Sequence, residues 1–139
     1  MSTIMPNVSC VAMRGRAVLI TGEPGSGKSS LALALLDRGA ALVGDDGVSL
    51  TVEDGRVIAS PPPNTEGLIE IRNVGLLEVP TASAPIAIVI ALNPGAERLP
   101  LGAGEAVILD CAIPRVDLYP DTPALPLRAE AALEIYGLP

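Results

Sequence analysis

The octet Gly-Glu-Pro-Gly-Ser-Gly-Lys-Ser at residues 22–29 constrains this chain more than any other segment. It matches the phosphate-binding pattern G-x-x-x-x-G-K-[ST]. In that pattern the backbone N–H groups wrap a phosphate, Lys28 contacts the β- and γ-phosphates and Ser29 ligates Mg²⁺. The flanks agree, because residues 16–21 form a short apolar run typical of a buried strand and residues 29–38 are rich in helix formers. We therefore expect a P-loop that binds a nucleotide with Mg²⁺ at a helix N-terminus. The residues expected to bind it are Gly22, Glu23, Pro24, Gly25, Ser26, Gly27, Lys28, Ser29 and Ser30.

Length and composition set the fold class and exclude some functions. The 139 residues suit a single domain spanning residues 1–139, and an apolar share of 49% is enough for a core that needs no disulfide or metal ion. That core must be aliphatic, because the chain has no Phe and no Trp. The shortage of aromatic residues and a net charge of −7 both argue against nucleic-acid binding, which needs stacking platforms or a basic surface.

Histidine is absent from the chain, which removes the commonest general base and the commonest metal ligand. Cys10 and Cys111 lack metal-type spacing, and we expect both to be small core residues. The longest apolar run, residues 86–92, is too short to cross a bilayer, and the N-terminus has no signal pattern. We therefore expect a soluble, cytoplasmic protein with no membrane partner.

Short apolar runs separated by Gly, Pro and Asp dominate the rest of the chain. They predict strands at residues 40–43, 48–52, 56–59, 68–72, 76–79, 86–92, 106–109 and 115–118. Asp54 and Gly55 lie between two of these runs and predict a hairpin turn, since Gly readily adopts positive φ. A second helix is predicted at residues 124–136, where Leu127, Ala131 and Ile135 recur every four positions. Because only two helices are expected, we predict a mixed, strand-rich α/β fold rather than an adenylate-kinase-like or GTPase-like sheet.

Two adjacent carboxylates, Asp45 and Asp46, follow the strand predicted at residues 40–43. Neighbouring strands of α/β folds end around one ligand crevice, so these carboxylates should lie near the P-loop. One can help to hold Mg²⁺, and the other could accept a proton from an attacking hydroxyl group. The alternative is that Asp-Asp-Gly forms only a tight turn.

Glu70 and Arg98 are weaker candidates. Glu70 alternates with isoleucines in a predicted strand, where a carboxylate needs a metal or a buried partner unless that face meets solvent. Arg98, after the strand at residues 86–92, is a candidate to stabilise charge on a transferring phosphoryl group. Taken from the residues alone, it is more simply a solvated loop arginine.

Four segments together resemble the catalytic domain of HPr kinase/phosphorylase, in the short bacterial form without the N-terminal domain. They are the P-loop, Arg38-Gly-Ala-Ala-Leu-Val-Gly-Asp-Asp46, Gly67-Leu-Ile-Glu-Ile-Arg-Asn-Val-Gly75 and Glu97-Arg-Leu-Pro100. The similarity runs from about residue 7 to residue 136. It implies a fold like the nucleotide-binding part of phosphoenolpyruvate carboxykinase. It also implies ATP-dependent phosphorylation of a serine on the phosphocarrier protein HPr or a paralogue, and a hexameric homo-oligomer.

The resemblance assigns roles by position. Lys28 would contact the phosphates, Ser29 and Glu70 would ligate Mg²⁺, and Asp46 would accept the proton of the substrate serine with Asp45 beside it. Arg98 matches the catalytic arginine of the family.

The chain also departs from the family pattern. Asn7 stands where the family has a histidine, Ser30 replaces a residue that is usually acidic, and Asn73 replaces a glycine. Asn cannot gain or lose a proton near neutrality, although Asn73 still tolerates left-handed backbone. A basic Pro-Gly-Arg-Asn stretch linked to phosphorylase activity is also missing, since residues 121–126 read Asp-Thr-Pro-Ala-Leu-Pro. These departures make phosphorylase activity doubtful and predict reduced kinase activity.

Three functions are therefore open from the sequence. The first is a Mg-ATP-dependent protein-serine kinase that acts on HPr or a paralogue. The second is a catalytically weakened regulatory or sensor module that binds ATP. The third is a kinase or phosphatase that acts on a small molecule. Phosphoryl transfer depends mainly on positioning and electrostatics, so the loss of the family histidine need not abolish it. This favours the first function.

Overall fold

The computed structural model describes residues 2–121 and 123–139. Its strands and helices follow in the order β1 (Ser2–Pro6), β2 (Ser9–Met13), β3 (Arg16–Gly22), α1 (Lys28–Asp37), β4 (Ala41–Gly44), β5 (Gly47–Glu53), β6 (Arg56–Ser60), β7 (Leu68–Ile71), β8 (Gly75–Glu78), β9 (Ala84–Leu92), β10 (Gly104–Ile108), β11 (Cys111–Leu118) and α2 (Leu125–Tyr136). Every element expected from the sequence is present within a few residues. The mixed, strand-rich α/β class is confirmed.

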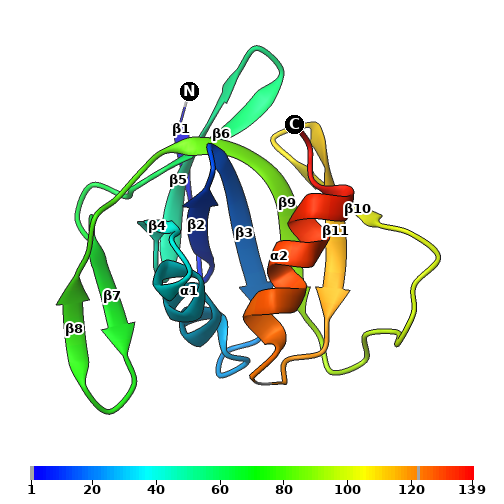
Figure 1. Ribbon diagram of the computed structural model, residues 1–139. Coiled ribbons are helices and arrows are strands. Elements are labelled where there is room, and N and C mark those ends of the chain that lie inside the picture. The colour runs from blue at the N-terminus through cyan, green and yellow to red at the C-terminus, as the bar shows by residue number, and fades with distance from the viewer. Residues whose placement is uncertain (1, 122) are drawn as a thin grey trace.

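The main sheet is mixed in direction. Its strands lie in the order β1-β5-β6-β9-β3-β2-β4, and β11 pairs with β9 and carries β10 at the edge. β9 runs parallel to both β3 and β11, whereas the other pairs are antiparallel. β9 is buried along nearly its whole length and curves across the molecule, pairing with β6 at its start and with β3 and β11 further on (Figure 1). This shared strand joins the two halves of the sheet.

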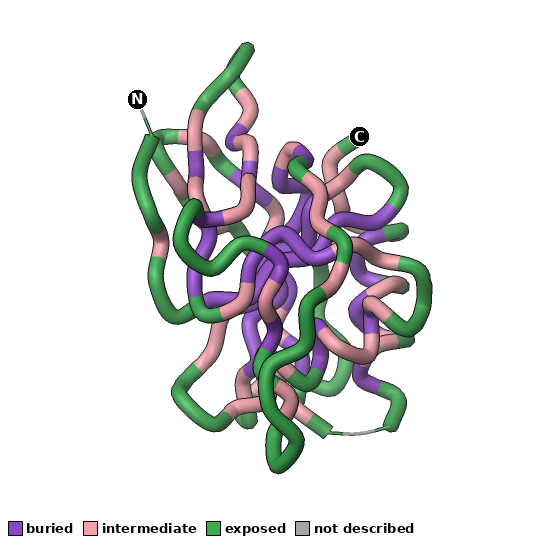
Figure 2. Tube along the Cα trace, turned by 90° about the vertical axis from the view of Figure 1, so that its left-hand side faces the viewer, coloured by how far each residue is buried: buried purple, intermediate pink, exposed green. Residues whose placement is uncertain are grey.

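Two apolar clusters hold the layers together. On one face of the sheet both helices pack over β2, β3 and β9, with fully buried leucines and isoleucines such as Leu35, Ile88 and Leu133. On the other face the half of the sheet made by β5 and β6 packs against β2, β3 and β9 through residues such as Leu19 and Leu50. In Figure 2 the buried residues are concentrated in the middle of the molecule. An aliphatic core without Phe or Trp is therefore sufficient to close both faces.

β1 and β2 are the strands that the sequence did not predict. All five residues of β2 are buried, so the strand has none of the alternation that marks a half-exposed strand. β1 is an exposed edge strand that ends at Pro6. The sequence signal for β2 was the pair Arg14-Gly15 between two apolar runs. In the structure these residues form the two-residue turn that joins β2 to β3 as a hairpin, with φ values of 52° and 80°.

β11 also begins earlier than expected, at Cys111 rather than Arg115. Pro114 argues against a strand in the sequence, because proline cannot donate to a ladder. In the structure β11 pairs with β10 from Cys111 onward, but it pairs with β9 only from Arg115. Pro114 therefore lies where β11 pairs with β10 on one side and is not yet paired with β9 on the other.

β7 and β8 form a separate two-stranded sheet that stands off the main body (Figure 1). Ile69 of β7 is completely buried and packs into the cluster around α1, while every residue of β8 is exposed. An isolated hairpin is marginal in water. Ile69 is thus the anchor that holds this hairpin against the P-loop helix.

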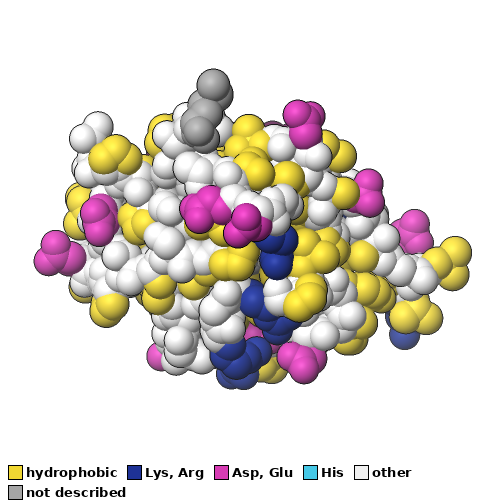
Figure 3. All heavy atoms as spheres, turned by 90° about the horizontal axis from the view of Figure 1, so that it is seen from above, with side chains coloured by type: hydrophobic (Ala, Val, Ile, Leu, Met, Phe, Trp, Pro, Cys, Tyr) yellow, Lys and Arg dark blue, Asp and Glu magenta, His cyan; other side chains and the backbone are white. Residues whose placement is uncertain are grey.

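The cysteines and the surface complete the description. Cys10 is fully buried, and burial raises the pKa of its thiol far above the ordinary range, whereas Cys111 is only half-buried at the edge of the second cluster. Figure 3 shows the end of the molecule opposite the P-loop, where basic side chains gather in a short row and acidic ones are scattered. Neither helix in the described residues is long and apolar enough to span a bilayer.

Candidate active site

The P-loop joins the end of β3 to the start of α1. β3 ends at Gly22 and α1 begins at Lys28, after Gly27 with a left-handed φ of 104°. Within the described residues no side chain caps α1, so the first N–H groups of the helix point outward without a side-chain partner. This end of a helix favours an anion through its free donors and its partial positive charge. The strand, loop and helix required by the sequence motif are all present.

Ser26 Oγ provides a test of whether this loop fits a phosphate. The atom is buried, and among residues 2–121 and 123–139 it has no hydrogen-bond partner. A Cβ built on Gly22 would lie 2.5 Å from it, so only glycine leaves room at this point of the loop. A buried hydroxyl without a partner is costly, and a polyphosphate oxygen would supply the acceptor. The donor-rich cradle therefore fits the group that the sequence implies.

The Lys28 ammonium lies across the loop. Its Nζ donates hydrogen bonds to the carbonyl oxygens of Gly22 at 2.8 Å and Glu23 at 3.1 Å. These contacts fix the side chain over the P-loop rather than in solvent. An ammonium carries a further N–H that remains available to a phosphate oxygen.

Asp45 is held by three hydrogen bonds from three elements. Its Oδ1 accepts from Ser9 Oγ at 2.9 Å and from Ser29 Oγ at 2.7 Å, and its Oδ2 accepts from the N–H of Glu70 at 3.2 Å. A carboxylate beside the P-loop serine is the arrangement that holds Mg²⁺ in P-loop enzymes. The structure thus puts Asp45, rather than the Glu70 side chain, against Ser29.

Asp46 is presented differently from its neighbour. It is exposed, has a left-handed φ of 63°, and its carbonyl oxygen accepts a hydrogen bond from the N–H of Asn7 at 3.1 Å. The turn depends on Gly44, because a Cβ there would lie 2.1 Å from the carbonyl oxygen of Gly47. The Asp45 carboxylate is therefore fixed by hydrogen bonds, whereas the next residue, Asp46, is exposed.

A cleft of about 480 Å³ lies over these groups. The P-loop and the start of α1 form one wall, and the β7–β8 hairpin forms the other. Its lining residues are Asn7, Pro24, Gly25, Gly27, Lys28, Ser29, Ser30, Asp46, Glu70, Arg72 and Asn73. The structure therefore brings together most of the nucleotide-binding and catalytic residues expected from the sequence, from four separate segments.

The donor set suits a Mg²⁺ ion shared with phosphates. Within the described part of the chain, no three acidic or cysteine side chains come close enough to hold a metal alone. Mg²⁺ usually binds one or two carboxylates together with phosphates and water. The Ser29 hydroxyl, the Asp45 carboxylate and the nearby Glu70 fit that pattern.

The comparisons with known proteins show the family to which this chain belongs. The family model described as HPr Serine kinase C-terminal domain matches residues 3–119. The chain belongs to this family. The solved Hpr(Ser) kinase/phosphatase from Coxiella burnetii is 30% identical and superposes with a TM-score of 0.81, over 95% of this chain and 88% of that one.

Curated relatives of this HPr kinase domain are much longer. The HPr kinase/phosphorylase of Clostridium tetani is 45% identical over 71 residues, which cover 51% of this chain and 23% of that protein. The HPr kinase/phosphorylase of Clostridium botulinum (strain Eklund 17B / Type B) is 45% identical over 69 residues, 50% of this chain and 23% of that protein. The aligned part is thus about a quarter of the length of these relatives.

Arg98 lies apart from the other expected residues of the HPr kinase domain. It is exposed on the loop at residues 93–103, between β9 and β10, and it is not among the residues that line the cleft. That loop borders a smaller cavity of about 270 Å³, where Arg115 and Asn93 bind the Asp117 carboxylate. In this conformation Arg98 contributes nothing to the lining of the cleft over the P-loop.

Two site residues were missed or undervalued in the sequence. Ser9 is a buried polar residue whose hydroxyl binds Asp45, but no local motif marks it. Arg72 lines the cleft, and its spacing of two from Glu70 was the available signal. Asn73 behaves as expected, with a left-handed φ of 69°.

Proposed function

We propose that this chain is a Mg-ATP-dependent protein-serine kinase domain that acts on the phosphocarrier protein HPr or a paralogue. The observation that carries the proposal is that the neighbouring carboxylates Asp45 and Asp46 have different surroundings. Asp45 is fixed against Ser29, whereas Asp46 is exposed in the same cleft as Lys28. The family and the similar solved structure support a kinase-type phosphotransferase.

Each residue has a role in this proposal. The P-loop N–H groups, Ser26 Oγ and Lys28 bind the phosphates, and Ser29 with Asp45 and Glu70 would hold Mg²⁺, which neutralises phosphate charge when bound. The acceptor hydroxyl oxygen attacks the γ-phosphorus, and the bond from that phosphorus to the β–γ bridging oxygen breaks. The hydroxyl proton passes to the Asp46 carboxylate, and ADP leaves with the electrons of the broken bond.

Asn7 favours a second candidate, an ATP-binding regulatory module of the same family. Asn7 lines the cleft next to Asp46, where the family has an ionisable histidine, and it cannot carry a proton. We expect the loss of the histidine to slow the phosphate-dependent dephosphorylation of phospho-HPr more than the forward transfer, because the forward step has its own base in Asp46. A pure sensor would bind ATP and gain thermal stability without transferring phosphate.

Incubation of the purified chain with γ-labelled ATP, Mg²⁺ and HPr tests the proposal. We expect label on a serine of HPr, with loss of both nucleotide affinity and transfer in Lys28→Ala. An HPr variant in which the acceptor serine is alanine is the matched control. ATP binding without any labelled HPr or paralogue would reject the kinase and leave the sensor.

A further inference from the structure

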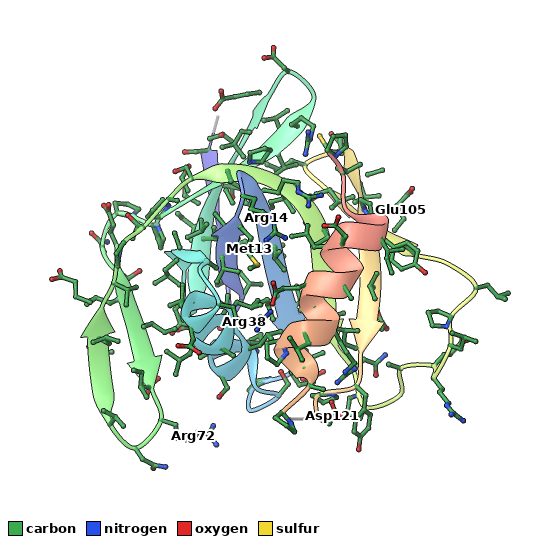
Figure 4. The ribbon with its side chains drawn as sticks, viewed as in Figure 1. Met13, Arg14, Arg38, Arg72, Glu105 and Asp121 are labelled. Atoms are coloured by element: carbon green, nitrogen blue, oxygen red, sulfur yellow. The ribbon has the colours of Figure 1, made fainter. Side chains whose placement is uncertain are left out.

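Arg72 is the arginine that the fold delivers to the cleft. It lies in the turn between β7 and β8, where the carbonyl oxygen of Ile71 accepts a hydrogen bond from the N–H of Val74 at 2.9 Å. Asn73 supplies the left-handed φ of 69° that such a turn needs at its third position. The side chain leaves this turn toward the P-loop end of α1 (Figure 4). The turn therefore aims a guanidinium at the phosphate cradle.

The segment before Arg72 is fixed at two neighbouring points. Ile69 is completely buried in the cluster around α1, and the N–H of Glu70 donates to Asp45 Oδ2. Asp45 in turn binds Ser29 at the start of α1. The position of Arg72 is thus tied to the phosphate-binding helix through both packing and hydrogen bonds, although the hairpin is outside the main sheet.

The Arg72 guanidinium has its donors available. Across residues 2–121 and 123–139 no hydrogen bond or salt bridge engages it, while most other arginines are paired. Those contacts are Arg16 with the Leu133 and Leu138 carbonyls, Arg38 with Glu130, Arg56 with the Pro139 carbonyl, Arg115 with Asp117, and Arg128 with Asp121. Arg14 and Arg98 are exposed and do not line the cleft.

A second cationic side chain in the cleft, besides Lys28, suits the charge of the transferring phosphoryl group. Lys28 already donates to two loop carbonyls, and Asp46 and Glu70 add negative charge to the same cleft. Guanidinium groups match phosphate oxygens with paired N–H donors, which an ammonium cannot do. In phosphoryl transfer such a group stabilises charge on the equatorial oxygens.

We propose that Arg72 contacts the transferring phosphoryl group and stabilises it during transfer, a role that the family resemblance gives to Arg98. This inference rests on the proposed phosphotransfer. In the step, the acceptor oxygen bonds to the γ-phosphorus as the bridging oxygen departs with ADP, and the proton goes to Asp46. Arg72 holds the equatorial oxygens of the γ-phosphorus and neither gains nor loses a proton.

The inference is tested by measuring the binding of Mg-ADP with and without aluminium fluoride, which mimics the phosphoryl group during transfer. Calorimetry should show at least about tenfold tighter ADP binding by the wild-type chain when fluoride is added. Arg72→Ala should lose most of that gain and Arg72→Lys part of it, while the affinity for ADP alone changes less than about threefold. Unchanged ADP affinity also shows that the variant is folded.

Two further variants make the test selective. Arg14→Asn removes the same charge at the β2–β3 turn, far from the P-loop in Figure 4, and should keep the whole gain, because asparagine suits its left-handed φ of 52°. If Arg98→Ala abolishes the gain and Arg72→Ala keeps it, Arg72 is not the phosphoryl-binding arginine. Equal loss of ADP and ADP-fluoride binding in Arg72→Ala overturns the proposal as well, as does a wild-type chain with no gain.

Kinetics separate this inference from the proposed function. With HPr and ATP, Arg72→Ala should lower kcat by about a hundredfold or more with little change in the KM for ATP. Free guanidinium should restore part of the rate in Arg72→Ala but not in Lys28→Ala. A fluoride gain that depends on Arg72, in a chain that labels neither HPr nor a paralogue, would reject the proposed acceptor and retain the role of Arg72.

Discussion

Ser29 Oγ donates a hydrogen bond to Asp45 Oδ1 at 2.7 Å, which joins the first turn of the P-loop helix to the strand that follows it. Ser9 Oγ donates to the same oxygen from β2, a strand between β3 and β4 in the sheet. The other oxygen of Asp45 accepts from the N–H of Glu70. One carboxylate thereby sets the distance between the phosphate loop, the sheet and the hairpin that carries Arg72.

Replacement of Asp45 by asparagine should weaken the metal dependence of nucleotide binding. The amide keeps the size of the side chain but removes its charge. Because its NH₂ group only donates, the amide must lose either the Glu70 N–H or the two hydroxyl groups as donors. We expect the affinity for ATP in Mg²⁺ to fall about tenfold or more toward the affinity measured with EDTA. Calorimetric titrations with and without Mg²⁺ measure this. An Asp45→Asn chain that retains the full Mg²⁺ effect would exclude Asp45 as a ligand.

Replacement of Asp46 by asparagine should separate binding from transfer. Asparagine accepts the left-handed φ of 63°, so the turn should be preserved, but it cannot accept the hydroxyl proton. We expect ATP affinity within about threefold of wild type and a loss of about a hundredfold in transfer rate. Equal losses of affinity and rate would indicate that the carboxylate is structural or a metal ligand instead.

Replacement of Asn7 by histidine should introduce a titrating group into the cleft. The left-handed φ of 62° is a conformation that histidine also adopts, so the backbone need not move. We expect the rate of phosphate-dependent dephosphorylation of phospho-HPr to rise and to acquire a pH dependence centred near about 6.5. Asn7→Gly, which cannot titrate, is the control and should show no such step. A profile as flat as that of wild type would contradict the prediction.

The sequence specified local structure well where its signals are local. The P-loop, the Asp54-Gly55 turn and both helices were predicted, and the two turn residues have positive φ values of 51° and 76°. β2 was missed because complete burial removes alternation. The side chains of Leu127 and Ile135, taken as the periodic face of α2, are exposed, and the helix packs instead through Leu125 and Leu133. Because that helix has apolar residues on both faces, the periodicity of the sequence does not show which face is buried.

The site shows a similar limit. The sequence indicated that Asp45 and Asp46 would meet the P-loop, because strand ends converge in such sheets. It could not say which carboxylate binds Ser29, since that depends on the turn geometry imposed by Gly44 and on a hydroxyl from Ser9. The placement of Arg72 depends on a hairpin outside the main sheet, which no periodic pattern locates.

Truncation of Ile69 should release the β7–β8 hairpin. Ile69 is completely buried against α1, and removing such a side chain costs about 2–5 kcal/mol of the free energy of unfolding. Ile69→Ala should therefore lower stability to urea and speed hydrogen exchange across residues 68–78. Leu76→Ala, at a position 71% exposed on the same hairpin, should change stability by less than about 0.5 kcal/mol. Similar effects of the two variants would show that Ile69 does not anchor the hairpin.

Replacement of Asp117 by asparagine should make stability less sensitive to acid. The Arg115 hydrogen bond, aided by the Asn93 amide, holds the pKa of Asp117 below its ordinary value. Because the folded pKa is lowered, the ionised carboxylate stabilises the fold above the unfolded pKa of about 4 and loses this effect as the pH falls through the folded pKa. The pair is partly exposed, so the difference at pH 7 should be below about 1 kcal/mol. Urea unfolding of both chains between pH 7 and pH 2 should show the wild-type advantage shrinking only below about pH 4. An advantage that stays constant over this range would mean that Asp117 acts by shape rather than by charge.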